Sequence, residues 1–288
     1  MYFILVPVIL WYAIFCYAPM YGIVMAFQDY IMSRGYFRSS FVGLKHFVAL
    51  YHDSYFRRAF YNTAIIAVYR VVTIFPFSII LALILNEIRR MAFRKTVQTI
   101  IYVPHFLSWV IVASIFLTFF NPEKGIIAAI NEITGKRTLD ILINPNLFRH
   151  ILILTDIWKE AGFSTVIYVA GIAGIDPILY EAAIVDGAGR WAQIWHITLP
   201  GIKSVIVISF ILLLGNVLTW GFDQIFNFYN PMVYSTGDIL GTYIYRTAMA
   251  DMKFSYGAAA GLFQSVICAV LLLSSNYALR KMGETSIY

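Results

Sequence analysis

The stretch from Asp176 to Pro200 reads DPILYEAAIVDGAGRWAQIWHITLP, and it separates two long apolar runs. Its charged residues make it unsuited to cross a bilayer. Asp176 is a good N-cap and a proline follows at the first helical position, so we predict a short helix that ends at Gly187. Glycine enters a left-handed turn without steric cost, and a second short helix should follow. The first helix is apolar almost all round, which indicates that it buries against another protein.

The composition excludes an ordinary soluble chain. Of 288 residues, 60% are hydrophobic and 12% are charged, whereas soluble domains carry roughly 25% charged residues. Aromatic residues make up 17%, which is typical of a polytopic membrane protein with interfacial aromatic belts. Both cysteines, Cys16 and Cys268, lie in apolar runs, so we expect neither a disulfide framework nor a metal site. The net charge of +6 then indicates contact with lipid headgroups and not with nucleic acid.

Six apolar runs follow one another, each near the roughly 20 residues that a helix needs to cross a bilayer. We predict an all-α membrane protein, with one transmembrane domain over residues 1–288 and a loop at residues 176–200. The predicted spans are residues 3–27, 60–85, 96–120, 150–175, 201–222 and 255–279. The first run starts almost at Met1 without flanking basic residues, so we expect a trimmed start or a preceding cytoplasmic leader.

Basic residues predict the orientation of these spans. Arg89, Arg90, Arg94 and Lys95 crowd the short loop after span two, and two more basic residues directly follow span six. Cytoplasmic loops carry an excess of Lys and Arg. Both termini and residues 176–200 are therefore predicted to be cytoplasmic.

Patterns for catalysis and nucleotide binding are missing from the sequence. Gly135-Lys136 lacks the upstream glycine and the following Ser or Thr of a phosphate-binding loop, and no Gly-x-Ser-x-Gly motif occurs. The five histidines are scattered without the spacing of metal ligands. We therefore expect a chain that is not an enzyme and holds no cofactor of its own.

Within the opening stretch, EAAxxDGA at residues 181–188 and IxLP at residues 197–200 resemble the EAA loop of binding-protein-dependent ABC importer permeases. The loop lies where those permeases carry it, before the last two spans. Nearly the whole chain is similar to the six-span carbohydrate branch, of which maltose permeases are the type. YxPHFLSW at residues 102–109 and GIDPxLYE at residues 174–181 resemble permeases that import complex oligosaccharides.

This resemblance implies a division of labour across a bacterial inner membrane. Two permeases, expected to be different chains, would form the path for an oligosaccharide that an extracytoplasmic binding protein delivers. Two ATPase subunits would bind ATP and Mg on the cytoplasmic face. The residues implied to couple this chain to an ATPase are Glu181, Ala182, Ala183, Asp186, Gly187 and Ala188.

The coupling residues have different implied roles. Glu181 would pair with a basic residue of the ATPase, and Gly187 would make the turn between the two short helices. Ala182 and Ala183 would let the helix seat deeply because they are small. Asp186 favours a cap of the turn or of the second helix over contact with the ATPase, since Asp is common at caps.

Four ionisable residues fall inside predicted spans: Arg70, Asp156, Lys159 and Glu160. Such groups usually face a bundle interior or an aqueous path. Two interpretations stay open. Arg70 could form an internal ion pair with Asp156 or Glu160, or the four residues could line a hydrophilic cavity for a sugar.

Spans five and six add uncharged candidates for the substrate path. Asn216 and Trp220 lie four apart on one predicted helical face, with Ser209 more than a turn away. Aromatic faces suit the C–H surface of a sugar ring, and amides suit its hydroxyls. Ser209 and Asn216 also match positions that resemble sugar-contacting ones in maltose-type permeases, and Gln264 is a further candidate. Hydrogen bonding to the paired permease is an open alternative.

The predicted outer loop between spans one and two is basic. It either meets the binding protein or attracts an anionic oligosaccharide, and steering of that kind is screened beyond about 8 Å at physiological salt. The basic residues concerned are Arg34, Arg38, Lys45, Arg57 and Arg58.

We therefore predict a transport subunit that works by alternating access in an ATP-driven oligosaccharide importer. One alternative is a secondary transporter driven by an ion gradient, in which Asp156 and Glu160 carry protons. That alternative leaves the apolar helix after Asp176 without a purpose. Another is a permease of the same family for a non-sugar solute, which differs only in the chemistry of the cavity.

Overall fold

A computed structural model describes residues 2–134 and 141–281, so the Gly135-Lys136 pair lies outside the described residues. The described chain is mostly helical, which confirms the predicted all-α class. Its two strands, β1 (Gln28–Asp29) and β2 (Ser40–Phe41), form a small antiparallel pair in which Gln28 lies opposite Phe41. These strands only close the loop that follows the first apolar helix.

The residues group into two compact units, which we describe separately. Unit 1 comprises residues 1–61 and 238–267, and unit 2 comprises residues 62–237 and 268–288. The helices α4 (Ser54–Glu87) and α17 (Phe254–Lys281) each contain a boundary between the units. One transmembrane domain over the whole chain stays a prediction.

Unit 1 is built on the first apolar helix and on the beginnings of α4 and α17. Ala59 of α4 and Ala259 and Ala260 of α17 have no exposed surface, and small residues of this kind let helices approach closely. Leu50 and Phe56 complete this core. The helices of unit 1 are α1 (Tyr2–Tyr12), η1 (Ala13–Tyr17), η2 (Ala18–Phe27), α2 (Gly35–Arg38), α3 (Lys45–His52), α16 (Leu240–Tyr245), η7 (Arg246–Ala250) and the starts of α4 and α17.

One carboxylate, that of Asp53, ties the helices of unit 1 together. It accepts hydrogen bonds from the backbone N–H of Tyr55 at 2.7 Å, from the Tyr243 hydroxyl at 2.6 Å and from the Tyr256 hydroxyl at 3.1 Å. Burial alone would raise the pKa of Asp53, but these hydrogen bonds outweigh burial and hold the pKa below its usual value. Burial, together with the bond to Asp53, raises the pKa of Tyr243. Asp53 is therefore charged and Tyr243 neutral at neutral pH.

We expect Asp53→Asn to lower the stability of the permease by about 1–3 kcal/mol at neutral pH, because the hydroxyls lose a charged acceptor. The pKa of Asp53 is depressed on folding, so its contribution is present above about pH 4 and is lost as the pH falls through the folded-state pKa. Thermal unfolding in detergent should therefore show the difference between wild type and variant narrowing in acid. A difference that stays constant over this range would contradict the assignment.

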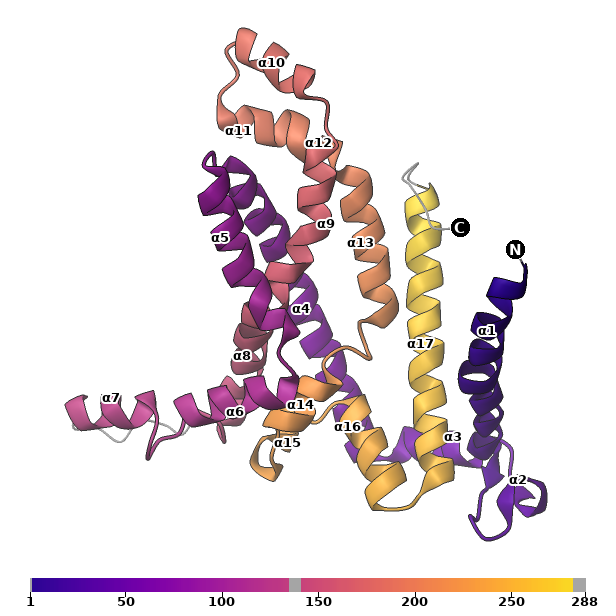
Figure 1. Cartoon of the computed structure of the whole chain (residues 1–288). Coiled ribbons are helices and arrows are strands. Elements are labelled where there is room, and N and C mark those ends of the chain that lie inside the picture. Colours follow the sequence, from indigo (N-terminus) through magenta and orange to yellow (C-terminus); the bar gives the residue numbers. More distant parts are fainter. Residues whose placement is uncertain (1, 135–140, 282–288) are drawn as a thin grey trace. The chain divides into compact units, whose positions relative to one another are not determined.

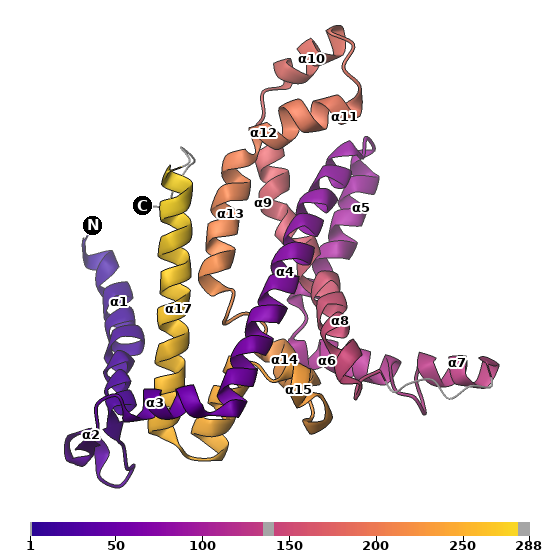
Figure 2. The ribbon, with the colours of Figure 1, turned by 180° about the vertical axis from the view of Figure 1, so that it is seen from behind.

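Unit 2 contains the remaining helices. In both views α4, α5 and α9 lie side by side, and α10 projects beyond α11 (Figure 1, Figure 2). The helices are the rest of α4, α5 (Met91–Tyr102), η3 (Val103–Phe106), α6 (Trp109–Phe119), α7 (Ile126–Thr134), α8 (Pro145–Asp156), η4 (Ile157–Ala161), α9 (Gly162–Ala173), α10 (Pro177–Val185), α11 (Arg190–Gln193), η5 (Ile194–Thr198), α12 (Leu199–Gly201), α13 (Lys203–Asn216), α14 (Phe222–Phe228), η6 (Pro231–Val233), α15 (Tyr234–Gly237) and the end of α17.

Three of the described helices are by themselves long and apolar enough to cross a membrane, and the number rises to six if each of three bent pairs is one span. The predicted third span, over residues 96–120, is bent, and its place as one span stays a prediction. The chain leaves the helix at Leu107, and the parts before and after the break differ in direction by 100°. Ser108 begins α6 as its N-cap, with its side chain accepting from the N–H of Ile111. The N-cap at Ser108 therefore divides the predicted span into two helical parts.

The predicted fifth span, residues 201–222, is also shorter than expected. Its straight part, α13, ends at Asn216. Gly221 then has φ +89°, a left-handed conformation that starts α14 in a new direction. The residues between them form a turn and not a continuation of the helix.

Candidate functional site

The helix α10 begins and ends as its sequence predicts. The Asp176 side chain accepts a hydrogen bond from the N–H of Ile178 at 3.0 Å, with proline at the first helical position. At the other end Gly187 has φ +76°. The N–H of Ala188 donates to the carbonyl of Ala183 at 2.8 Å, and that of Gly187 donates to the carbonyl of Ile184 at 3.0 Å. This is a Schellman motif, and it confirms Gly187 as the helix stop.

An exposed apolar face runs along α10, which has no buried residue. Ile178 and Val185 are 66% and 86% exposed, and they lie on one side of the helix because they are seven residues apart. Glu181 lies between them on the same side, three residues after Ile178. Its carboxylate has no hydrogen bond or ion pair among the described residues. The small Ala182 is exposed beside it.

The loop that carries α10 is held to the rest of unit 2 by polar contacts. The Tyr180 hydroxyl lies 2.9 Å from Oγ1 of the buried Thr198. Gln193 donates to the carbonyl of Ala188 at 2.9 Å, which fixes the turn against α11. Arg190 pairs with Glu87 of α4 at 2.7 Å. A displacement of α10 would therefore be transmitted to α4.

The structure corrects the prediction for Asp186. This residue is the C-cap of α10, but its carboxylate makes no hydrogen bond to the described residues. The N-cap of α11 is Gly189, and no side chain caps that helix. Two residues separate Asp186 from the N-cap Gly189. The left-handed Gly187 turns the chain between them, so Asp186 does not cap the second helix as predicted.

A cavity of about 670 Å³ lies among α4, α9, α13 and the turn after α13. Three serine hydroxyls belong to its wall, those of Ser78, Ser164 and Ser209. The Ser209 hydroxyl is buried without a hydrogen-bond partner among the described residues, and Tyr168 also lines the cavity. The aromatic part of the wall comprises Phe75, Phe163, Tyr168 and Trp220. Hydroxyls beside aromatic faces suit a polyhydroxylated ring, and the lining contains no charged residue.

Of the uncharged candidates, Ser209 and Trp220 line this cavity. Asn216 does not, since it is exposed at the end of α13 and donates to the carbonyl of Leu212 at 3.3 Å. The predicted common helical face of Asn216 and Trp220 is wrong, because Trp220 lies in the turn before the left-handed Gly221. Gln264 belongs to unit 1 and is described apart from the cavity. A role of any of the four in the substrate path stays a prediction.

Arg70 and Asp156 form the internal ion pair that the sequence left as one of two interpretations. Nε of Arg70 lies 2.7 Å from Oδ2 of Asp156, and the side chains are 1% and 0% exposed. Arg70 also donates to the carbonyl of Trp220 at 2.6 Å and to the side chain of Gln224. A Cβ at Gly221 would collide with the guanidinium. Neither member of the pair lines the cavity.

Gln224 extends this network to α8 and was missed in the sequence. Its amide donates to the carbonyl of Leu152 at 2.7 Å and to the hydroxyl of Thr155 at 2.8 Å. The side chain is fully buried. A glutamine three residues after a glycine carries no local signal of such a role, so its partners could not be inferred.

Lys159 and Glu160 form a second polar cluster with His105. Lys159 donates to the carbonyl of His105 at 2.8 Å and to Glu160 at 2.8 Å, and Glu160 lies 2.7 Å from Nδ1 of His105. The imidazole stacks on Phe163 with ring centroids 4.0 Å apart. Phe163 lines the cavity. The cluster therefore packs against Phe163 in the cavity wall. The sequence did not indicate this cluster, because its histidines are scattered.

These features agree with what the chain is similar to. A sequence model described as "Binding-protein-dependent transport system inner membrane component" matches residues 74–284. The chain belongs to this family. It is thus an inner-membrane permease component of an ABC importer and not an enzyme, as the EAA-loop resemblance implied. A secondary transporter is excluded by the same match.

Similar proteins include carbohydrate permeases. The polygalacturonan/rhamnogalacturonan transport system permease protein YteP of Bacillus subtilis (strain 168) is 42% identical over 288 residues, which are 100% of this chain and 90% of that protein. Protein LplB of the same organism is 39% identical over 289 residues, covering 100% of this chain and 91% of that protein. A bacterial ABC transporter involved in the import of the acidic polysaccharide alginate matches with a TM-score of 0.90 and 40% identity, over 98% of this chain and 96% of that chain.

A bacterial alginate ABC transporter in complex with an alginate pentasaccharide-bound periplasmic protein is also similar. That structure matches with a TM-score of 0.91 and 40% identity, over 99% of this chain and 96% of that chain. At this identity and coverage, nearly the whole chain has the fold of an ABC importer permease.

We expect Arg70→Met to destabilise the permease by about 3–5 kcal/mol, because Asp156 would remain buried without a counter-charge. The double variant Arg70→Met/Asp156→Leu should recover most of that loss, since neither charge is then buried alone. Thermal unfolding of the purified permease measures both effects. A double variant no more stable than the single one would contradict a role centred on the ion pair.

Proposed function

We propose that this permease forms, with a second permease, the path for an acidic oligosaccharide, and that α10 is the helix on which an ATPase subunit acts. The observation that carries the proposal is the exposed face of α10, where Glu181 lies between Ile178 and Val185. An apolar face with one unpartnered carboxylate favours a cleft that is apolar and contains a basic residue. ATP and Mg would be bound by the ATPase subunits.

The contacts around α10 support its role in coupling. The Schellman turn fixes α10 to α11, and the Arg190–Glu87 pair joins α11 to the end of α4. Ile74 and Ser78 of the same helix line the cavity. A displacement of α10 would therefore be transmitted through α4 to the wall of the cavity. Alternating access requires a connection of this kind between the ATPase and the substrate path. The four basic residues after α4 favour a cytoplasmic location for this end of the permease and for both termini.

The relatives and the cavity favour an acidic oligosaccharide. Polygalacturonan and alginate, named for two of the matched transporters, are both chains of uronate sugars. The cavity offers aromatic faces and hydroxyls but no cation. It would hold the rings and hydroxyls of such a chain, while the carboxylates would be recognised by the second permease or by the periplasmic binding protein.

We expect Val185→Asp to weaken association with the ATPase at least tenfold, because a buried valine contributes about 1.5–3 kcal/mol and the new charge would be buried against the apolar wall of the cleft. Transport and substrate-stimulated ATP hydrolysis by the assembled importer should fall together. Ile133→Asp is the matched control, since Ile133 is 85% exposed on α7. Equal effects of the two variants would argue against α10 as the coupling helix.

We expect Ser209→Ala to reduce oligosaccharide uptake about fivefold, the effect of losing roughly 1 kcal/mol from one hydrogen bond to the sugar. ATP hydrolysis without substrate should remain unchanged, because Ser209 lies away from α10. Ser114→Ala on α6 is a control, as its exposed hydroxyl bonds only to the carbonyl of Val110. Uptake assays in proteoliposomes that show no loss for Ser209→Ala would remove the cavity from the substrate path.

A further inference from the structure

A groove separate from the cavity lies between α4 and the helices that follow α10. Its volume is about 690 Å³, and its walls come from one face of α4 and from α11, η5 and α12. Ile80 and Ile84 on one wall are 53% and 56% exposed. The only charged residues of the lining are Glu87 and Arg190, which pair at 2.7 Å and so neutralise each other. The interior of the groove is therefore apolar.

Two tryptophans form the wall opposite α4. Trp191 and Trp195 are 76% and 64% exposed and lie four residues apart, on one side of the helix. Tryptophan concentrates at the level of the lipid headgroups, where its ring is apolar and its N–H stays wet. The wall thus has the composition of a membrane interface, while α4 is one of the helices long enough to cross the bilayer.

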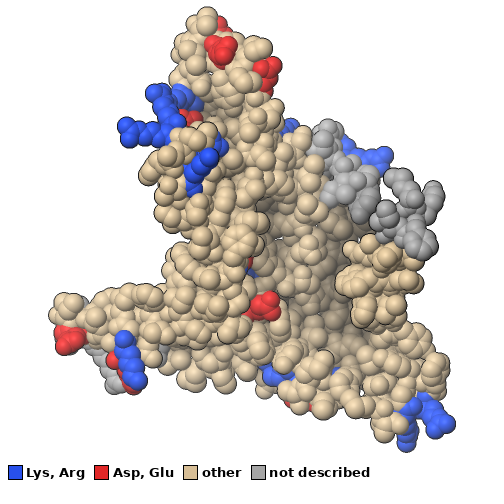
Figure 3. Space-filling view, viewed as in Figure 1, with Lys and Arg blue, Asp and Glu red and all other residues tan. Residues whose placement is uncertain are grey.

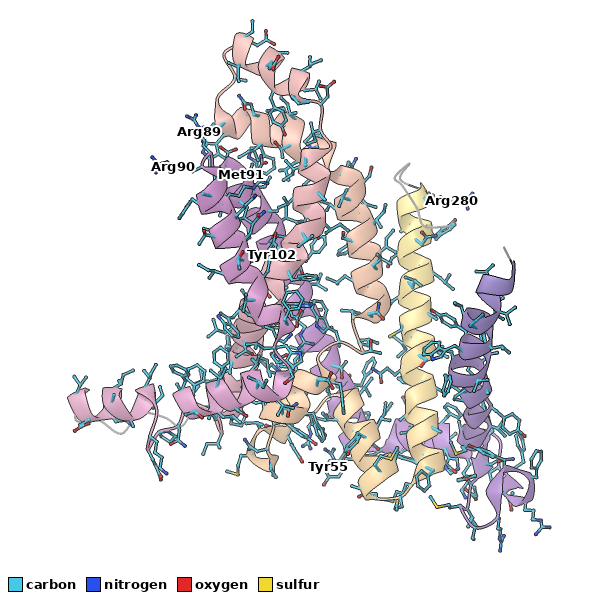
Figure 4. The ribbon with its side chains drawn as sticks, in the orientation of Figure 1. Tyr55, Arg89, Arg90, Met91, Tyr102 and Arg280 are labelled. Atoms are coloured by element: carbon cyan, nitrogen blue, oxygen red, sulfur yellow. The ribbon has the colours of Figure 1, made fainter. Side chains whose placement is uncertain are left out.

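Positive charge lies next to the end of the groove at Glu87, on two arginines that follow this lining residue in the sequence. Arg89 and Arg90 follow Glu87 at the end of α4 and are exposed, and their side chains make no ion pair or hydrogen bond to the described residues. Figure 4 shows both pointing outward at this end of α4, below α11. In Figure 3 one group of Lys and Arg side chains lies below the tip formed by α10. An anionic group would complement the charge of these arginines.

We propose that this groove binds an anionic phospholipid, with an acyl chain along α4 and the phosphate at Arg89 and Arg90. The apolar walls would cover the chain, and the indoles would lie at the level of the glycerol and headgroup. The arginines favour a lipid with net negative charge over a zwitterionic one, whose own cation they would repel. The lipid would fill the space between α4 and α11, beside the contact that joins α10 to the cavity. This site is independent of the proposed substrate and of its path.

The test uses the assembled importer, with both permeases and the ATPase subunits, in vesicles of phosphatidylcholine. Equal fractions of brominated phosphatidylglycerol or brominated phosphatidylcholine are added, since bromine quenches tryptophan that it touches. The signal of the groove is the difference between the wild type and Trp191→Phe/Trp195→Phe. We expect preferential quenching by brominated phosphatidylglycerol, with about fivefold higher affinity for each arginine that contacts the phosphate.

Arg89→Gln/Arg90→Gln should abolish this preference and leave quenching by both lipids equal. The matched control is Arg280→Gln, because Arg280 is also exposed and lies near the end of α17, labelled in Figure 4. Equal quenching in the wild type, or a preference that survives Arg89→Gln/Arg90→Gln, would overturn the proposal. So would the absence of quenching by either lipid, which would show that a protein chain covers the groove.

Discussion

The buried ion pair between Arg70 and Asp156 is the constraint on which the cavity depends. Removing two charges from water is costly, and the cost is offset only when the remaining donors and acceptors are also satisfied. Here the guanidinium meets a carboxylate, a backbone carbonyl and Gln224, which itself bonds to α8, whereas Oδ1 of Asp156 has no hydrogen bond among the described residues. These contacts fix the turn after α13, and with it Trp220 in the cavity wall. A polar network inside the helices thus shapes a surface that is itself uncharged.

The helix α4 connects this network to the coupling loop. Arg70 and Glu87 lie 17 positions apart on it, which is about 25 Å of straight helix. The first is locked into the network, and the second pairs with Arg190 beside α10. Pro76 lies between them and removes one hydrogen bond of the helix, so this is where α4 is most easily bent. Force applied at α10 would therefore move one end of α4 relative to a fixed point at the other.

Local signals in the sequence predicted the coupling loop well. Asp176 and Gly187 act through their own backbone neighbours, so a cap and a left-handed turn could be inferred residue by residue. The break at Leu107 precedes the local N-cap at Ser108, which an apolar run alone does not reveal. The partners of Gln224 lie on a helix distant in sequence, so hydrophobic runs do not encode them. The membrane spans were recognised as apolar segments because length and composition suffice. Their bends were missed, and with them the position of Trp220.

Under the proposed function, in which the cavity is part of the substrate path, the absence of charge from its lining has a consequence for transport. A cation in the wall would bind a uronate chain more tightly but would also hold it, whereas a path has to release its substrate. Two buried basic side chains close to lining residues, Arg70 and Lys159, are already paired with Asp156 and Glu160. Aromatic faces and hydroxyls provide many weak contacts that can be exchanged as the chain moves. Acidic sugars are then best selected before they enter the path. The protein that delivers the oligosaccharide can bind it tightly, because it does not have to conduct it.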